Sequence, residues 1–285
     1  MEVKKNVLVS VCCVTYNHEK YIAQAVESFL MQRCNFQIEI IIGEDHSTDN
    51  TGQILAYYQK KYPELLKVVR AEANVGSIKN QVLTMKAATG KYIAMCDGDD
   101  FWTDPQKLQQ QVDFLEAHPE YVICCHYTRV INQKGQTVYL NPRPQSLEFS
   151  YEDLLLGRRD ETRICSLMIR NTEAVRAIGS TDWYHKTYGS DTFFKLYATN
   201  TGQKIYVIPK VMACYRLHTG GIWSMIDPKL RKSRTISDFQ LMINHFQYNA
   251  DQKKALLKIY LQQYLLFNLR YFRFHQTAQI IRSLW

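Results

Sequence analysis

The sequence predicts an α/β fold in which a mostly parallel sheet is flanked by helices and followed by a helical C-terminal extension. Three observations support this prediction. Strand-like and helix-like patterns alternate over residues 1–120, and polar residues follow the strand-like runs. The chain contains no Gly or Pro after Pro228, which favours helix in the tail. Repeated β-α units of this length are typical of a parallel sheet with helices on both faces.

The strand-like runs of the first half are apolar and rich in β-branched residues, whereas the helix-like runs repeat apolar residues at helical spacing. The expected strands cover residues 7–17, 36–45, 65–72 and 91–100, and the expected helices cover residues 19–32, 49–63, 76–90 and 104–119. In sheets of this kind, ligands bind beyond the carboxyl ends of the strands. We therefore expect the polar residues at these strand ends to line a binding crevice.

The pattern becomes mixed after residue 120. The expected elements are two strands within 121–140 joined at Lys134-Gly135, a strand at 164–170, a short helix at 190–200 and a pair of strands at 204–218. We therefore expect one unit over residues 1–227, with halves at 1–120 and 121–227, and a helical extension over residues 228–285.

Composition limits the protein classes that fit. A chain of 285 residues with 46% hydrophobic content can bury a large core, and no apolar run is long enough to predict a transmembrane helix. The apolar N-terminal run lacks a small-residue cleavage site, so we expect a core strand there and no signal peptide. The eight cysteines form no C-x-x-C pair, which argues against zinc and favours small buried side chains in a reducing cytoplasm.

The net charge of +8 lies in the tail, because residues 228–285 carry ten of the 35 Lys and Arg residues but only two of the 27 acids. These basic residues alternate with Tyr, Phe, Leu and Trp. Two interpretations remain open: helices that pack on the preceding unit with a solvated basic face, or basic amphipathic helices that lie on an anionic membrane surface. No motif for nucleic-acid recognition accompanies the charge, so we expect no nucleic-acid partner.

The segment MCDGDDFWTD, residues 95–104, places Asp97, Asp99 and Asp100 directly after a strand-like run. Like charges this close raise each other's pKa unless a positive charge lies between them. A hard divalent cation that also binds a phosphate would supply that charge, and Mg²⁺ and Mn²⁺ favour carboxylate oxygens. Gly98 would let the backbone bend tightly and approach a ligand closely. The alternative is a capped turn, because Asp and Gly are common in turns.

Five segments, in order, resemble those of the family-2 glycosyltransferases, which have the GT-A fold and use nucleotide-sugar donors. They are VSVCCVTYNHEKYIAQAVESFLMQ, EIIIGEDHSTDNTGQIL, NVGSIKNQVLTMKAATGKYIAMCDGDDFW, YGSDTFFKLYA and YRLHTGGIWS. The third segment ends in the Asp-x-Asp metal motif of that family. The resemblance covers residues 7–220, and it implies a GT-A catalytic domain at 1–227 with a nucleotide-binding half at 1–120 and an acceptor half at 121–227.

The resemblance also implies which residues bind the donor and the metal. Asp45 would accept a hydrogen bond from the base of a uracil-like ring, with a helix-entry cap as the alternative. Asp97 would contact ribose or a metal-bound water, and Asp99 would ligate Mn²⁺ or Mg²⁺ directly. His218 would ligate the metal or contact the diphosphate, unless it is a turn histidine. The other donor contacts would come from Thr15, Tyr16, Asn17, Lys79 and Gly98, although Lys79 also fits an exposed helix face.

By the same resemblance, Asp191 is the base that removes the proton of the acceptor hydroxyl, or else it caps the helix that follows. Trp102 and Trp183 would contact acceptor or sugar, with core packing as the alternative. Asp100 would also contact acceptor or sugar, or else position its neighbours. The implied reaction is an inverting, in-line transfer of one hexosyl or N-acetylhexosaminyl group. The donor is expected to be a UDP-sugar, with thymidine or guanosine donors still open, and the acceptor a glycan or lipid-linked oligosaccharide.

Two departures from the family pattern refine this prediction. The sequence lacks the Q-x-x-R-W motif of processive members, and its second acidic motif reads Glu44-Asp45 where many relatives have two Asp. We expect a non-processive enzyme of cell-surface polysaccharide biosynthesis, in the cytoplasm or peripheral on the inner face of its membrane. Two alternatives remain. One is a nucleotidylyltransferase of related fold, which would need a Gly-rich basic loop after the first strand. The other is a catalytically inactive protein that binds nucleotide-sugar or glycan without turnover.

Overall fold

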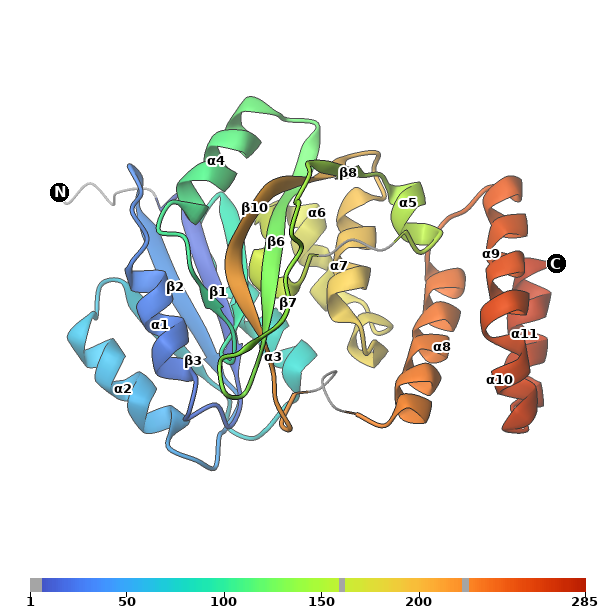
Figure 1. Cartoon of the computed structure of the whole chain (residues 1–285), viewed down its shortest axis with the longest axis horizontal. Helices are drawn as coiled ribbons and strands as arrows, with labels where there is room; N and C mark the ends of the chain where they lie inside the picture. Colours follow the sequence, from blue (N-terminus) through green and yellow to red (C-terminus); the bar gives the residue numbers. More distant parts are fainter. Residues whose placement is uncertain (1–6, 159–161, 222–225) are drawn as a thin grey trace.

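A computed structural model describes residues 7–158, 162–221 and 226–285 of the chain (Figure 1). These residues contain a ten-stranded sheet in the order β3-β2-β1-β4-β9-β6-β10-β5, with β7 paired to β6 and β8 paired to β10. The strands are β1 (Val9–Thr15), β2 (Ile38–Glu44), β3 (Leu66–Arg70), β4 (Tyr92–Asp97), β5 (Phe101–Trp102), β6 (Tyr121–Asn132), β7 (Thr137–Tyr139), β8 (Leu147–Phe149), β9 (Met168–Arg170) and β10 (Lys204–Leu217).

The long strands of the sheet all run in one direction. They are β1, β2, β3, β4, β6 and β10, whereas β5, β7, β8 and β9 are short and antiparallel to their neighbours. The predicted mostly parallel sheet is therefore confirmed. In its register, Val14 lies opposite Asp97 and Thr15 lies opposite Glu44. The carboxyl ends of β1, β2 and β4 thus meet at one edge of the sheet.

Helices cover both faces of the sheet (Figure 1). They are α1 (Ile22–Leu30), α2 (Thr51–Lys61), α3 (Ser77–Lys86), α4 (Lys107–Ala117), α5 (Tyr151–Leu155), α6 (Glu173–Arg176), α7 (Ser190–Thr199), α8 (Pro228–His245), α9 (Ala250–Gln263), α10 (Leu265–Arg270) and α11 (Phe274–Leu284). Helices α1, α2 and α4 share one core cluster with Cys13, whereas α3, α7 and the C-terminal helices share the other with Cys12. Adjacent cysteines thus face opposite sides of the sheet, and all eight cysteines are free.

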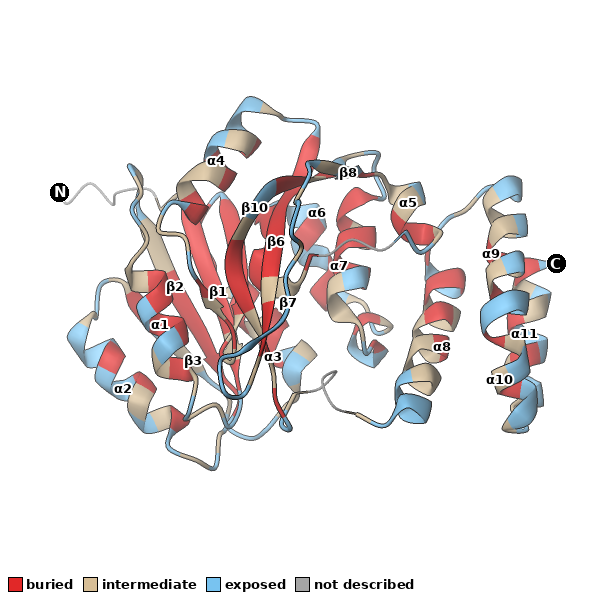
Figure 2. Cartoon of the chain, viewed as in Figure 1, coloured by how far each residue is buried: buried red, intermediate tan, exposed pale blue. Residues whose placement is uncertain are grey.

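The tail is helical, as predicted, and α8 packs on the side of the molecule that carries α7 (Figure 2). The rings of Trp183 and His245 stack with centroids 5.6 Å apart, and those of Phe193 and Phe246 lie 6.0 Å apart. The packing interpretation therefore holds for α8. Helix α8 is 18 residues long and mixes charged with apolar residues, and within the described ranges no helix is both long and apolar enough to cross a membrane.

Two expected elements differ from the structure. Residues 204–218, predicted as a pair of strands, form the single long strand β10, whose register against β6 shifts between Ile208 and Val211. Pro209 lies in that irregular stretch, where its missing N–H is tolerated as in a β-bulge. Residues 164–170, predicted as one strand, form a 3₁₀ turn (Ile164–Ser166) followed by β9.

Candidate functional site

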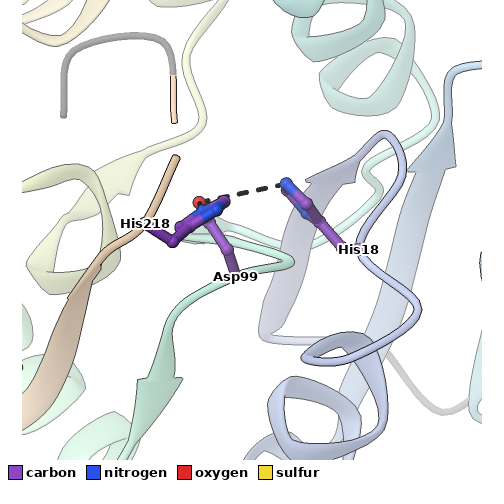
Figure 3. A group of neighbouring side chains, drawn as sticks. All are labelled: His18, Asp99 and His218. Atoms are coloured by element: carbon purple, nitrogen blue, oxygen red, sulfur yellow. Dashed lines mark hydrogen bonds and ion pairs between the residues drawn. The ribbon is translucent and has the colours of Figure 1, made fainter. Parts of the chain in front are cut away.

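Three side chains from distant parts of the chain meet at the carboxyl edge of the sheet (Figure 3). Asp99 lies in the turn between β4 and β5, His18 lies between β1 and α1, and His218 follows β10 directly. The Nε2 atom of His218 is 2.8 Å from Oδ2 of Asp99, and Nε2 of His18 is 3.9 Å from the same oxygen. One ligand atom from each residue lies within 4.8 Å of the other two. The three residues, hereafter the metal triad, could therefore hold one cation.

The loop after β1 holds His18 in place. Oγ1 of Thr15 lies 3.1 Å from Nδ1 of His18, which leaves Nε2 on the side of Asp99. A partner on the second ring nitrogen is the usual way of orienting a metal-binding histidine. Asn17, with a φ of 54°, accepts the N–H of Thr48 through Oδ1 at 2.8 Å and so ties this loop to the one after β2. Tyr16 is 41% exposed at the same edge.

Gly98 allows the acidic turn to pack against this loop. A Cβ at Gly98 would lie 2.7 Å from Oγ1 of Thr15 and 3.0 Å from Nδ1 of His18. The Gly98 N–H also donates to the carbonyl oxygen of Val14 at 2.9 Å. Glycine is therefore required at position 98 because the backbone approaches Thr15 and His18 closely. The sequence did not predict this contact.

The acids of the turn have different electrostatic surroundings. Burial, followed by the charges of Asp99 and Asp191, raises the pKa of Asp97. Burial alone would also raise the pKa of Asp99. The hydrogen bond with His218 and the proximity of His18 outweigh burial, so the pKa of Asp99 is lowered. Burial lowers the pKa of His18. The neutral imidazole that binds metal ions is thereby favoured.

Asp100 is the innermost acid, with 1% of its surface exposed. Its Oδ1 accepts the N–H of Arg216 at 2.8 Å, and Nε of Arg216 donates to the backbone oxygen of Asp99 at 3.0 Å. Burial, and then the charges of Asp99 and Asp97, raise the pKa of Asp100. The prediction that Asp100 contacts acceptor or sugar is therefore wrong for this structure, because the side chain is enclosed. The alternative of positioning its neighbours fits, since Asp100 and Arg216 together join β10 to the acidic turn.

Asp45 has a role that differs from the predicted base contact. Its side chain is 2% exposed, and its two oxygens accept the N–H groups of Val75 and Gly76 at 2.7 and 2.9 Å. Asp45 therefore clamps the loop that leads into α3 and presents no free surface to a base. Lys79 is exposed on α3 and lines, together with Val75 and Gly76, a hollow of about 460 Å³.

The two tryptophans are packing residues here. Trp102 is 1% exposed, its indole N–H donates to the carbonyl oxygen of Cys165 at 2.9 Å, and its ring lies 4.7 Å from that of Phe29. The predicted sugar contact of Trp102 is therefore wrong, and the core alternative holds. Trp183 is half-buried among aromatic rings that join α7 to α8, including Phe246 at 5.2 Å. This packing does not support the predicted sugar contact of Trp183.

Asp191 is the second residue of α7. Its carboxylate is near enough to Asp97 to contribute to the raised pKa of that residue. The residue that precedes the helix is Gly189, and Oδ1 of Asp191 accepts the N–H of Thr192 at 2.9 Å. Asp191 is therefore not the N-cap of α7, and its carboxylate lies within electrostatic range of Asp97.

Sequence reasoning did not identify His18. The available signal was its position, because His18 follows β1 closely and the ends of β1 and β4 meet at one edge. Thr15, Asn17, Asp97, Gly98, Asp99 and His218 were all predicted, and the structure brings them together at this edge. Residues 222–224, which end the segment YRLHTGGIWS, lie outside the described residues.

Two solved structures share this fold. The S. aureus protein TarS, residues 1–349, in complex with UDP-GlcNAc has a TM-score of 0.67 and 20% identity, over 97% of this chain and 79% of that one. The mannosyltransferase PcManGT from Pyrobaculum calidifontis, in complex with GDP-Man and Mn²⁺, has a TM-score of 0.65 and 16% identity, over 96% and 73%. The α/β sheet and its flanking helices thus define a protein with the GT-A fold.

The sequence places the chain within a family. The model of Glycosyl transferase family 2 matches residues 10–179. An uncharacterized protein of Mycobacterium tuberculosis, Rv1520, is 35% identical over 220 residues, which cover 75% of this chain and 60% of that protein. TuaG of Bacillus subtilis, provisionally named a teichuronic acid biosynthesis glycosyltransferase, is 39% identical over 108 residues, or 38% of this chain and 42% of that one. The chain belongs to glycosyl transferase family 2, and its match spans less than two thirds of each relative.

Proposed function

We propose that this protein is a metal-dependent, inverting glycosyltransferase that moves one sugar from a nucleotide-sugar to a hydroxyl group. The observation that carries the proposal is the metal triad, in which one carboxylate and two imidazoles converge beside a second carboxylate, Asp97. Such a set of donors is suited to a divalent cation, and a cation at this edge of the sheet would neutralise the developing charge of a nucleoside-diphosphate leaving group.

His18, Asp99 and His218 are the proposed ligands. Their two nitrogen atoms and one oxygen favour Mn²⁺ over Mg²⁺, because Mg²⁺ is usually bound through oxygen atoms alone. Asp97 would contact the ribose or a metal-bound water. Further donor contacts are proposed for the loop residues and the exposed lysine beside this edge, Thr15, Tyr16, Asn17, Gly98 and Lys79.

Asp191 is the proposed base. A carboxylate within reach of the acceptor hydroxyl would take its proton as the oxygen attacks the anomeric carbon from the face opposite the diphosphate. A single displacement of this kind inverts the configuration at that carbon. Asp191 sits in the first turn of α7, so the positive end of the helix dipole lies beside its carboxylate.

The names of the relatives support the proposed substrate classes. TarS is described with UDP-GlcNAc and PcManGT with GDP-Man, and TuaG is named for teichuronic acid biosynthesis. We propose a hexosyl or N-acetylhexosaminyl group carried on UDP as the donor, and a glycan or lipid-linked oligosaccharide of a cell-surface polysaccharide as the acceptor.

The proposed location is the inner face of the cytoplasmic membrane, with α10 and α11 on an anionic surface. Leu266, Phe272 and Trp285 are 77%, 81% and 88% exposed there, and Arg270 and Arg282 are exposed beside them. Phe272 also holds a φ of 55°, which is costly for an aromatic residue. Apolar side chains among basic ones are what binding to anionic lipid requires.

This location is tested by sedimentation with vesicles of phosphatidylglycerol or of phosphatidylcholine. We expect binding to the former alone, and a loss of at least about tenfold in Phe272→Asn, which keeps a residue that tolerates positive φ. The matched control is Tyr57→Asn, at an exposed aromatic position on α2. Equal binding to both vesicle types, or equal loss in both variants, would contradict the proposed location.

The activity is tested by release of nucleoside diphosphate from a panel of nucleotide-sugars with Mn²⁺, Mg²⁺ or EDTA. We expect release from one donor with Mn²⁺ that EDTA abolishes, and loss of both Mn²⁺ binding and turnover in Asp99→Asn. The control Asp251→Asn removes the same charge from a side chain that is 94% exposed on α9. If no donor shows metal-dependent binding by titration calorimetry, the proposal is wrong. If donor binds but Asp191→Asn turns over normally, the assignment of the base is wrong.

A further inference from the structure

Helix α8 reaches back into the domain that carries the sheet and holds the turn in front of α7. The carboxylate of Asp238 accepts two backbone N–H groups, from Tyr188 to Oδ1 at 2.9 Å and from Gly189 to Oδ2 at 2.8 Å. These residues directly precede α7, and Gly189 is its N-cap residue. One side chain of the C-terminal extension therefore fixes both peptide groups at which α7 begins.

A second contact from α8 reaches the same turn. The guanidinium group of Arg234 lies over the ring of Tyr188, 5.0 Å from its centroid. The Asp238 carboxylate is largely enclosed, and burial, together with a smaller contribution from Asp191, raises the pKa of Asp238 to about 6, while the two N–H donors and Arg234 act in the opposite direction. Enclosing a carboxylate is costly unless hydrogen bonds compensate, so the two bonds account for its presence.

Asp191 lies within electrostatic range of both this anchor and the acidic turn. The charge of its carboxylate contributes to the raised pKa of Asp97 and to the raised pKa of Asp238. Only Gly189 and Ser190 separate the anchored Tyr188 from Asp191 along the chain. Any displacement of the anchored turn is therefore passed directly to the proposed base.

We propose that Asp238 is a positioning residue for Asp191, so that the C-terminal helix α8 completes the catalytic site from outside the sheet domain. The proposal rests on the function proposed above. A base that is misplaced by about 1 Å can lose about a hundredfold in rate even when the substrate still binds. Asp238 therefore acts on the chemical step and leaves donor binding at the metal triad unaffected.

The test compares Asp238→Asn with three other variants. Asparagine can accept only one of the two N–H groups, so we expect kcat for nucleoside-diphosphate release to fall by about tenfold or more, with the donor KM changed by less than about twofold. Asp238→Glu keeps the carboxylate and should recover part of kcat. Tyr151→Phe removes another bond to the tail, from Tyr151 Oη to the carbonyl oxygen of Gln247 at 2.6 Å, and should lower the Tm without lowering kcat. Asp251→Asn should resemble the wild type.

Hydrogen exchange at Tyr188 and Gly189 gives a readout that does not depend on turnover. We expect faster exchange of both amides in Asp238→Asn and wild-type exchange in Tyr151→Phe. The proposal is overturned by unchanged exchange, by a kcat within about twofold of the wild type, or by an equal loss of kcat in Tyr151→Phe. Normal turnover in Asp191→Asn would instead refute the assignment of the base, and that variant reports on the proposed function separately.

Discussion

Replacing Gly98 with alanine should disturb the metal triad without changing any charge. The new Cβ would lie 2.7 Å from Oγ1 and 2.8 Å from Cβ of Thr15, and 3.0 Å from Nδ1 of His18. Thr15 ends β1 and is paired with Glu44 of β2, so its Cβ has little freedom to move. The acidic turn must therefore shift away from β1, and Asp99 moves with it.

The size of the effect follows from these contacts. Inserting a methyl group into packed surroundings costs about 1–3 kcal/mol. In a chain of this size each kcal/mol lowers the Tm by about 2–4 °C, so a cost of about 2 kcal/mol predicts a fall of about 4–8 °C. A changed orientation of a metal ligand typically weakens metal binding by about 10–100-fold. We expect the lower end of that range for Mn²⁺, because His218 is not among the atoms that the new methyl group meets.

The assay is thermal unfolding together with calorimetric titration of Mn²⁺. The matched control is Gly52→Ala, where the new Cβ would meet the end of the flexible Arg70 side chain at 2.9 Å. Gly52 lies in the first turn of α2, where alanine is favoured over glycine, so its Tm should stay the same or rise. If Gly98→Ala keeps both the wild-type Tm and the wild-type Mn²⁺ affinity, the packing argument for this glycine is refuted.

Three further predictions concern the buried polar side chains. Trp102→Phe leaves the Cys165 carbonyl without its donor and should lower the free energy of unfolding by about 1–3 kcal/mol in urea titrations; weaker donor binding at unchanged stability would contradict the core role. Asp45→Ala should lower the free energy of unfolding by about 1.5–3 kcal/mol and speed amide exchange at Val75. Unchanged exchange at Val75 would contradict the conclusion that Asp45 holds the loop before α3. Burial lowers the pKa of Lys107 to about 8, from 10.5 when unfolded. Between these values the unfolded chain binds more protons, so wild-type stability should rise with pH relative to Lys107→Met, by at most about 3 kcal/mol; parallel pH profiles in urea would contradict this.

The fold could be predicted where local patterns and sheet geometry agree. The alternation of strand and helix over the first half depends on apolar spacing, which the sequence displays directly. The second half was harder, and residues 204–218, which contain Pro209, were expected to form a pair of strands. The structure instead carries β10 through that position with a shift in register. Whether a proline ends a strand or sits in an irregularity depends on the neighbouring strand, and that neighbour is not visible in local sequence.

The part of the site that could be predicted consists of residues that lie at the ends of the parallel strands. Asp97 and Asp99 follow β4, and the parallel sheet places them beside the end of β1. His18 was missed because its direction depends on the loop after β1, which Thr15 and Asn17 hold in shape. Trp102 was misassigned because its burial is set by α1 and by the segment around Cys165, far away in sequence. The direction and burial of a side chain depend on tertiary contacts, and residue type alone does not reveal them.

Three acids within four residues are tolerated because the structure gives each a different environment. Asp100 is enclosed, and burial raises its pKa, so its protonated form is favoured and the repulsion within the turn is reduced. Asp99 faces His218 and His18, and despite its burial its pKa is lowered, so the negative charge of the turn concentrates there. The pKa of Asp97 is raised by burial and by its acidic neighbours, Asp191 included. Such an environment is costly for a carboxylate alone and favourable for one that shares a cation, and that difference would provide binding energy for the proposed metal.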